Sequence, residues 1–207
     1  MEMLYAALLG IAAFWLGACP FSLWVGHWLL GKDIRDYGDG NPGATNVFRA
    51  GGYKAASLAL SLDIAKGMPF VVLAYLLFGL PDIIVMIVAV SAIVGNAFSP
   101  VLGLKGGKSI AVTYGVLLAL PQHEMLVLFA VFMTLGFLIL GSNSWAVMLG
   151  PVGSVPYLVA TEAYVVASLF MLCVLVIFGI KQFEELKTGP RITGGLIGAF
   201  QSRRRQV

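Results

Sequence analysis

The sequence predicts an all-α integral membrane protein, and two observations lead to that prediction. Of the 207 residues, 59% are hydrophobic and only 11% are charged, and the mean hydropathy is +0.93. This is more apolar surface than one soluble core could bury. Apolar runs close to the roughly 20 residues that a helix needs to cross a bilayer recur with short polar breaks. We therefore expect a single membrane domain over residues 1–207.

The apolar runs predict about seven transmembrane helices. They extend from Leu4 to Leu30, Ala55 to Leu80, Ile83 to Leu102, Ile110 to Leu120, Met125 to Leu140, Trp145 to Ala160 and Ala163 to Ile180. The fourth run is shorter than the roughly 17 residues that a span normally takes. It must either borrow Gly106 to Ser109 or form a half-helix that is buried against its neighbours.

The basic residues predict the orientation of these helices. If the spans alternate, all of the 13 Lys and Arg residues fall on one side except Lys66, which lies inside a span. The other side has Glu2, Asp82, Glu124 and Glu162 but no basic residue. By the positive-inside rule the basic side is cytoplasmic, so we expect the N-terminus outside and the C-terminus in the cytoplasm.

The longest loop on the basic side contains the sequence GDGNPGATNVFR. Its glycines let backbone N–H groups converge around an anion, its amides and threonine are neutral donors, and its arginine suits phosphate. Alternatively, Asn41-Pro42-Gly43 makes a simple turn, with Pro42 and Gly43 as the two central residues. The candidate anion-binding residues are Gly38, Gly40, Asn41, Gly43, Thr45, Asn46 and Arg49.

Two further loops lie on the same side. GLKGGKS places Lys105 and Lys108 on either side of two glycines, which leaves the backbone open to an anion. Alternatively, these lysines only mark topology and extend towards lipid head groups. GSNS adds Ser142 and Asn143 as supporting candidates. Because all three loops connect inward helix ends, one pocket can draw on all of them, and this favours anion binding.

Asp63 and Lys66 lie three residues apart in the second span, which is the spacing of an ion pair on one helical face. The pair either supports the helix or contacts a polar substrate, since charges at membrane depth face the protein interior. Cys19 and Cys173 show no disulfide or metal-ligand spacing, and we expect no metal ion and no other cofactor.

Two segments resemble a known family. ACPFSLWVGHWLLGKDIRDYGDGNPGATNVFRAGGYKAASLALSLDIAKG, from Ala18 to Gly67, resembles the first third of the bacterial glycerol-3-phosphate acyltransferases of the PlsY family. That family has S-x-P-x-G, then G-S-G-N-x-G-A-T-N-x-x-R, then D-x-x-K-G. VGNAFSPVLGLKGGKSIAVTYG, from Val94 to Gly115, is similar to its G-H-x-F-P-x-F-x-x-F-K-G-G-K-G-V-A-T. Together the two segments make up nearly half of the chain.

The resemblance implies a PlsY-like seven-helix fold and transfer of a fatty acyl group from acyl phosphate to the 1-hydroxyl of sn-glycerol 3-phosphate. The product is lysophosphatidic acid, an intermediate of phospholipid synthesis. The resemblance places the enzyme in the bacterial inner membrane with its active site on the cytoplasmic face. We expect a monomer that contacts membrane lipids and no nucleic acid. Since phosphate leaves readily from a mixed anhydride, the protein need mainly neutralise phosphate charge and orient the hydroxyl.

Residue by residue, the resemblance implies these roles. Thr45, Asn46 and Arg49 match the family's phosphate loop, and Lys105 and Lys108 match its KGGK lysines. Asp63 and Lys66 match its D-x-x-K motif. We expect Arg49 and Lys108 to be the main phosphate clamps, with Thr45 and Asn46 as hydrogen-bond donors.

The chain departs from the family pattern at several polar positions. Asp39 stands where the family has serine, and its charge would repel phosphate unless it is paired, with Arg35 or Arg49 as the candidates. Asn96 replaces a histidine, and Gly179 and Gln182 replace a histidine and an asparagine.

These changes leave three alternatives to the family reaction open. The chain is an acyltransferase for another polyol phosphate, or a non-catalytic binder, or a transporter, of a phosphorylated solute or lipid. The short fourth segment suits a transporter, but a transporter is expected to show an outer anion site or an internal repeat, and neither is visible.

Overall fold

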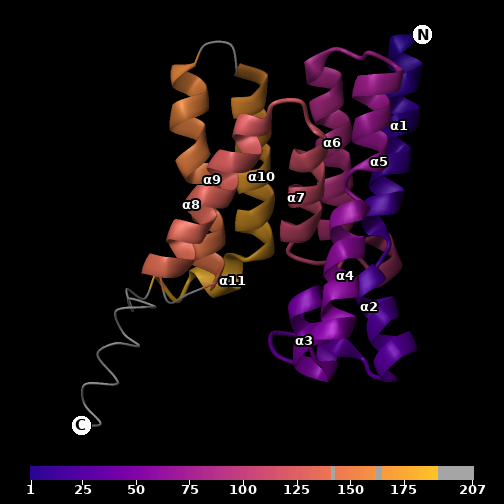
Figure 1. The fold of residues 1–207 in the computed structure, drawn as a ribbon, viewed down its shortest axis with the longest axis vertical. Helices are drawn as coiled ribbons and strands as arrows, with labels where there is room; N and C mark the ends of the chain where they lie inside the picture. The colour runs from indigo at the N-terminus through magenta and orange to yellow at the C-terminus, as the bar shows by residue number, and fades with distance from the viewer. Residues whose placement is uncertain (141–142, 162–164, 191–207) are drawn as a thin grey trace. The chain divides into compact units, whose positions relative to one another are not determined.

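The structure is a computed structural model, and it describes residues 1–140, 143–161 and 165–190 (Figure 1). Over these residues every regular element is a helix, which confirms the all-α prediction. The helices form two compact units, Met1–Gln122 and His123–Val207, and each is described by itself. The expectation of one membrane domain over residues 1–207 stays a prediction.

The first unit contains three helical stretches that are long and apolar enough to cross a membrane, Glu2–Leu30, Tyr53–Leu77 and Asp82–Leu102. None of them is one continuous α-helix. The first comprises α1 (Glu2–Ala18), α2 (Phe21–Val25) and the π-helical turn Gly26–Leu30; the second comprises α4 (Tyr53–Ala65), α5 (Pro69–Val72) and the π-helical turn Leu73–Leu77; the third comprises α6 (Asp82–Ala97) and the 3-10 turn Pro100–Leu102.

Shorter elements complete the first unit. They are the 3-10 turn Ile34–Asp36, α3 (Ala44–Gly51) and α7 (Ile110–Ala119). Figure 1 shows α3 below α4, at the end of the unit where the loops gather. Those loops contain the residues expected to bind an anion.

The first span is interrupted at Cys19 and Pro20. Cys19 has extended backbone angles, φ −62 and ψ 123, because a residue before proline avoids the helical region. Pro20 also has no N–H to donate. The interruption leaves the carbonyl group of Cys19 available to a side chain, which matters for the charged pair described below.

The fourth apolar segment is a short, buried half-helix, which was one of the two alternatives; the other was that it extends over Gly106 to Ser109. α7 covers only Ile110–Ala119, and Gly106 to Ser109 are not helical. Val112, Val116 and Leu117 are completely or almost completely buried. Gly115 approaches the carbonyl of Ile64 in α4, and Gly67, just past α4, approaches that of Val112. Two glycines therefore let α4 and α7 pack closely.

α1 and α6 pack by the same principle. Gly17 in α1 approaches the backbone carbonyl of Ala92, and Gly95 in α6 approaches that of Phe14. Lipid tails are as apolar as leucine, so helices in a membrane associate largely through close packing at small residues. The two glycines allow a backbone contact that any side chain would prevent.

We expect Gly17→Ala to destabilise this packing by about 1–3 kcal/mol, the usual cost of an overpacked contact. A Cβ at position 17 would lie 2.9 Å from the carbonyl carbon of Ala92 and closer still to its oxygen. Thermal unfolding in detergent measures the effect. Gly10→Ala in the same helix is the matched control, since its Cβ would meet Ser91 Oγ at an ordinary 3.6 Å. Equal unfolding temperatures for both variants would contradict the prediction.

The second unit consists of α8 (His123–Ile139), α9 (Asn143–Ala160), α10 (Val165–Lys181) and the short α11 (Phe183–Leu186). Phe129 and Phe178 meet in its core with ring centroids 6.3 Å apart. Ser144 donates a hydrogen bond to the Glu185 carboxylate, which joins the start of α9 to α11. The four shorter apolar helices are α7, α8, α9 and α10. The number of spans and their orientation stay predictions.

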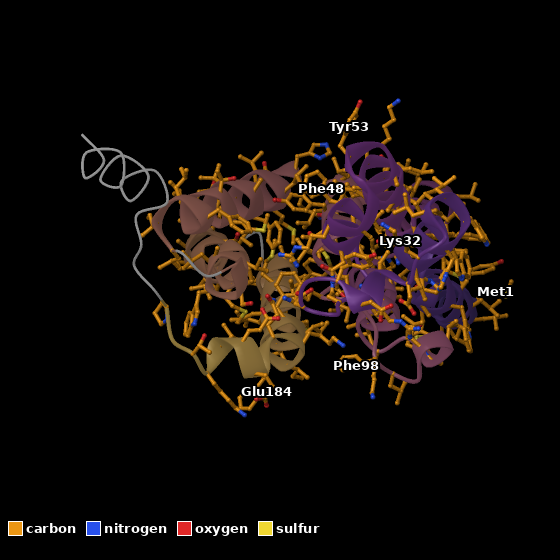
Figure 2. All side chains as sticks on the ribbon, turned by 90° about the horizontal axis from the view of Figure 1, so that it is seen from below. Met1, Lys32, Phe48, Tyr53, Phe98 and Glu184 are labelled. Carbon is orange, nitrogen blue, oxygen red and sulfur yellow. The ribbon has the colours of Figure 1, made fainter. Side chains whose placement is uncertain are left out.

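Exposed aromatic side chains lie near the loop end of the first unit. Trp28 is 76% exposed and stacks on Trp24, and Phe48 and Tyr53 are also exposed. Figure 2 shows Tyr53 projecting outward. Aromatic residues of this kind concentrate where a membrane meets water, so their position agrees with loops that lie at a membrane surface.

Candidate anion-binding site

The glycine-rich loop folds back through a turn at Tyr37–Gly40. The N–H of Gly40 donates to the carbonyl of Tyr37 at 3.1 Å, and Gly38 and Gly40 have φ values of +63° and +71°, which favour glycine. The proposed turn at Asn41-Pro42-Gly43 is wrong in this form. Gly43 has φ −133, and its N–H bonds to Asn41 only two residues back, at 2.8 Å.

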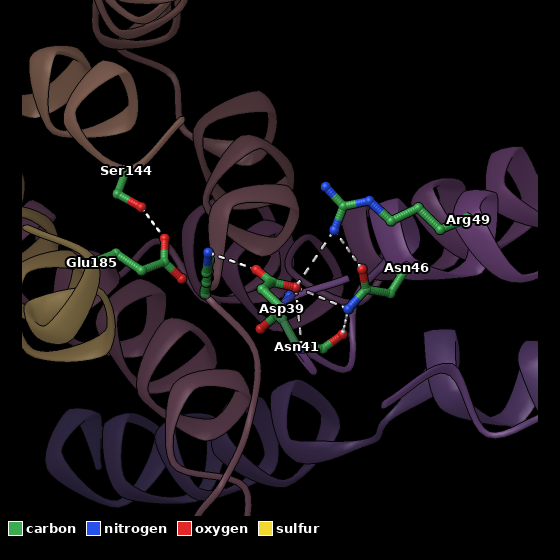
Figure 3. A network of polar contacts seen from close by, with 7 residues as sticks. Asp39, Asn41, Asn46, Arg49, Ser144 and Glu185 are labelled. Atoms are coloured by element: carbon green, nitrogen blue, oxygen red, sulfur yellow. Dashed lines mark hydrogen bonds and ion pairs between the residues drawn. The ribbon is translucent and has the colours of Figure 1, made fainter. Parts of the chain in front are cut away.

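The carboxylate of Asp39 is the centre of a polar cluster that this loop forms with α3 and the KGGK loop (Figure 3). Asn46 Nδ2 donates to Asp39 Oδ1 at 2.9 Å, and the backbone N–H of Asn41 donates to the same oxygen at 3.3 Å. Lys108 Nζ lies 2.8 Å from Asp39 Oδ2. Arg49 Nη1 lies 3.9 Å from Oδ1. These five residues are called the Asp39 cluster below.

Asn46 connects the parts of the cluster. It is completely buried, and its Nδ2 donates a second hydrogen bond, to the carbonyl of Asn41 at 2.9 Å. Its Oδ1 accepts a hydrogen bond from Arg49 Nη1 at 2.9 Å. Asn46 and Arg49 are three residues apart on α3 and so share a face. A Cβ at Gly38 would collide with both side chains, which is a second reason for glycine there.

The pKa of Asp39 is below its ordinary value. Its partial burial acts to raise the pKa, but the hydrogen bond and charge of Lys108, with the hydrogen bonds from Asn46 and Asn41, lower it by more. The side chain is still 37% exposed, so water screens these interactions in part. Asp39 is therefore a carboxylate at neutral pH, and it neutralises one of the two cations beside it.

The predicted partners of Asp39 are only partly right. Arg49 is a partner, but Arg35 instead pairs with Asp33 at 2.6 Å and lowers the pKa of that carboxyl to about 2. The nearest cation to Asp39, Lys108, was missed because it comes from a distant loop. Nothing in the spacing of the two motifs shows that their side chains meet.

The KGGK loop is held by Asn96 at the end of α6. The carbonyl of Asn96 accepts from the N–H of Gly107 at 3.0 Å, and its Nδ2 donates to Ser109 Oγ at 2.9 Å. Gly106 packs directly against the carbonyls of Asn96 and Ala97. Asn96, a supporting candidate, thus holds the loop that brings Lys108 to Asp39.

Two of the side chains expected to contact phosphate lie outside the Asp39 cluster. Thr45 is exposed in the first turn of α3, and Lys105 is exposed in the KGGK loop. Among the contacts described for residues 1–140, neither side chain reaches Asp39. Their expected contact with phosphate stays a prediction.

Asp63 and Lys66 form the ion pair that their spacing predicts, with Nζ 2.6 Å from Oδ1. Both residues are buried. Lys66 Nζ also donates to the carbonyl of Cys19 at 2.8 Å, and Ser22 Oγ donates to Asp63 Oδ2 at 2.5 Å. The pair thereby joins the end of α4 to the interruption between α1 and α2, which favours a structural role. Sequence reasoning missed both Ser22 and the interruption, for which Pro20 was the available signal.

The remaining candidates belong to the second unit. Ser142 and the side chain of Asn143 lie outside the described residues. Gln182 is buried, and its Nε2 has no hydrogen-bond partner among the described residues. Gly179 has Met148 Cε 3.7 Å from where its Cβ would be.

The sequence is similar to a known protein family and to several of its members. The family model of glycerol-3-phosphate acyltransferase matches residues 7–188. A glycerol-3-phosphate acyltransferase of Maridesulfovibrio salexigens is 40% identical over 157 residues, which cover 70% of this chain and 80% of that protein. One from Neisseria gonorrhoeae is 40% identical over 160 residues, which cover 76% of this chain and 74% of that protein.

Two solved structures share the fold. The crystal structure of PlsY (YgiH), an integral membrane glycerol 3-phosphate acyltransferase, in its glycerol 3-phosphate form superimposes with a TM-score of 0.79. It is 26% identical, and the match covers 94% of this chain and 98% of that one. The lysophosphatidic acid form of the same protein gives a TM-score of 0.77.

Proposed function

This chain belongs to the glycerol-3-phosphate acyltransferase family, and from that membership we propose a reaction and a site. It is a membrane-embedded acyltransferase of phospholipid synthesis. We propose that it moves a fatty acyl group from acyl phosphate to the 1-hydroxyl of sn-glycerol 3-phosphate and releases lysophosphatidic acid and inorganic phosphate.

The Asp39 cluster is the observation that carries this proposal. Two cations and a buried amide, from α3 and the KGGK loop, converge on one carboxylate. Groups arranged in this way around a carboxylate also suit a phosphate, since both are oxyanions that charged donors bind strongly. Arg49, with its planar guanidinium, and Lys108 are the proposed phosphate clamps, and Asn46 donates a hydrogen bond.

The proposed reaction needs no strong base from the protein. The 1-hydroxyl oxygen attacks the acyl carbonyl carbon and forms the ester bond, while the bond from that carbon to the phosphate oxygen breaks. The hydroxyl proton passes to a phosphate oxygen. The protein contributes by holding the two substrates together and stabilising charge on the departing phosphate.

The location of the site follows from charge. The Asp39 cluster lies in two segments, residues 31–54 and 103–109, which carry six of the 13 basic residues and neither of which is expected on the acidic side, and basic loops stay in the cytoplasm. We therefore propose that the active site lies on the cytoplasmic face of the bacterial inner membrane. The protein would be a monomer with its N-terminus outside and its C-terminus in the cytoplasm.

An acyl-transfer assay on the purified protein in detergent tests the proposal. Palmitoyl phosphate and glycerol 3-phosphate are supplied, and lysophosphatidic acid is measured against a reaction without protein. Palmitoyl-CoA in place of palmitoyl phosphate tests the donor. The expected result is product with palmitoyl phosphate as the donor and none with palmitoyl-CoA.

Two other results would each overturn part of the proposal. Product with a different polyol phosphate, but none with glycerol 3-phosphate, would change the acceptor. No product from folded protein with any of these substrates, together with measurable phosphate binding, would leave a binder or transporter of phosphorylated solutes or lipids.

A further inference from the structure

The carboxylate of Asp39 is held as a bound anion would be. Its Oδ1 accepts from the side chain of Asn46 and the backbone N–H of Asn41, and its Oδ2 faces Lys108. Arg49 is close enough for an ion pair. Backbone N–H groups, an amide and two cations are the donors that proteins gather for a phosphate. Here they surround a side chain of the protein itself.

The cluster has less positive charge than its cations suggest. Arg49 and Lys108 each contribute one positive charge, and the negative charge of Asp39 offsets one of the two. A phosphate that approached Lys108 and Asn46 would need donors that Asp39 now occupies. It would also meet the carboxylate as a like charge at short range, where repulsion is strong.

We propose that Asp39 is an internal anion that occupies the phosphate position of this site, so that a substrate phosphate binds only when the carboxylate leaves Lys108 and Asn46. The inference rests on the proposed function, because it takes Arg49 and Lys108 to be the phosphate clamps. It adds a residue that sets how tightly the site binds phosphorylated substrates.

The local backbone allows such a displacement. Asp39 stands between Gly38 and Gly40, both with positive φ. Glycine can adopt backbone angles that other residues cannot, so the backbone on either side of Asp39 can change conformation. The Asp39 side chain is 37% exposed, so it can turn towards water rather than into a packed core. Asn46 is also bonded to the carbonyl of Asn41 and to Arg49, so two of its contacts remain when Asp39 moves.

Binding of glycerol 3-phosphate, measured by isothermal titration calorimetry on detergent-purified protein, tests the proposal. We expect Asp39→Ser and Asp39→Asn to bind it about tenfold more tightly, which corresponds to about 1.4 kcal/mol. Asp39→Asn is the stricter variant, since its amide oxygen can still accept from Asn46 while the negative charge is gone. A lower KM for glycerol 3-phosphate in the acyl-transfer assay should accompany the tighter binding.

Arg49→Ala separates this proposal from the proposed function. If Arg49→Ala loses binding but both Asp39 variants bind as the unmodified chain does, or more weakly, the site assignment stands and the internal-anion proposal is overturned. If Arg49→Ala binds normally, the site assignment fails and this proposal fails with it. Thermal unfolding checks that each variant is folded. If Asp39→Ser does not fold, the binding result of Asp39→Asn decides the proposal.

Discussion

Arg49→Ala and Lys108→Ala are each expected to lower the rate of acyl transfer by about 100- to 1,000-fold, the usual effect of removing one charge-stabilising group from an active site. Each variant removes one of the two cations of the Asp39 cluster, and no neutral neighbour supplies that charge. The loss should appear in the production of lysophosphatidic acid, while expression and thermal unfolding change little. Near-normal rates for both variants would contradict the site assignment.

Arg35→Ala is the matched control for Arg49→Ala. Arg35 lies in the same segment between the first two candidate spans and is also paired with an aspartate, but that aspartate is Asp33 and the pair is exposed. Exposed ion pairs contribute about 0–1 kcal/mol, so Arg35→Ala should keep its activity. An equal loss in both variants would show that the loop needs general positive charge rather than the guanidinium of Arg49.

Lys66→Met is expected to destabilise the protein by about 3–5 kcal/mol, because it leaves a buried carboxylate without its charged partner. Asp63 and Lys66 are both buried, and Lys66 also binds the carbonyl of Cys19. The free energy of unfolding, or the unfolding temperature in detergent, measures the loss. The double variant Asp63→Asn with Lys66→Met should recover part of it, since no buried charge then remains.

Lys187→Met is the control for this prediction. Lys187 and Glu184 have the same three-residue spacing, with Nζ 2.7 Å from Oε1, but both side chains are more than half exposed. Breaking such a pair costs about 0–1 kcal/mol. If Lys66→Met cost no more than Lys187→Met, the buried pair would not join α4 to the first span as described.

The sequence alone was enough to predict the helices, and its motifs led to the proposal of an anion-binding site. Hydropathy is a local property, and each apolar run has a helix over most of its length. The i,i+3 spacing of Asp63 and Lys66 also predicted their contact, because one helix turn brings them together. In the same way, glycines, amides and cations in GDGNPGATNVFR indicated anion binding through their chemistry alone. All of these inferences depend on neighbours in the chain.

Only the tertiary structure decided which distant groups meet. Lys108 faces Asp39 because contacts of Asn96 and two glycines hold the KGGK loop against α6. The hydropathy pattern does not predict such contacts. The structure likewise showed that Lys66 binds the carbonyl left at the Cys19 interruption. It also showed that α7 stays short and packs on α4 through Gly115. The physical reason is that contacts between separate segments depend on how closely their backbones approach, and no local pattern encodes that distance.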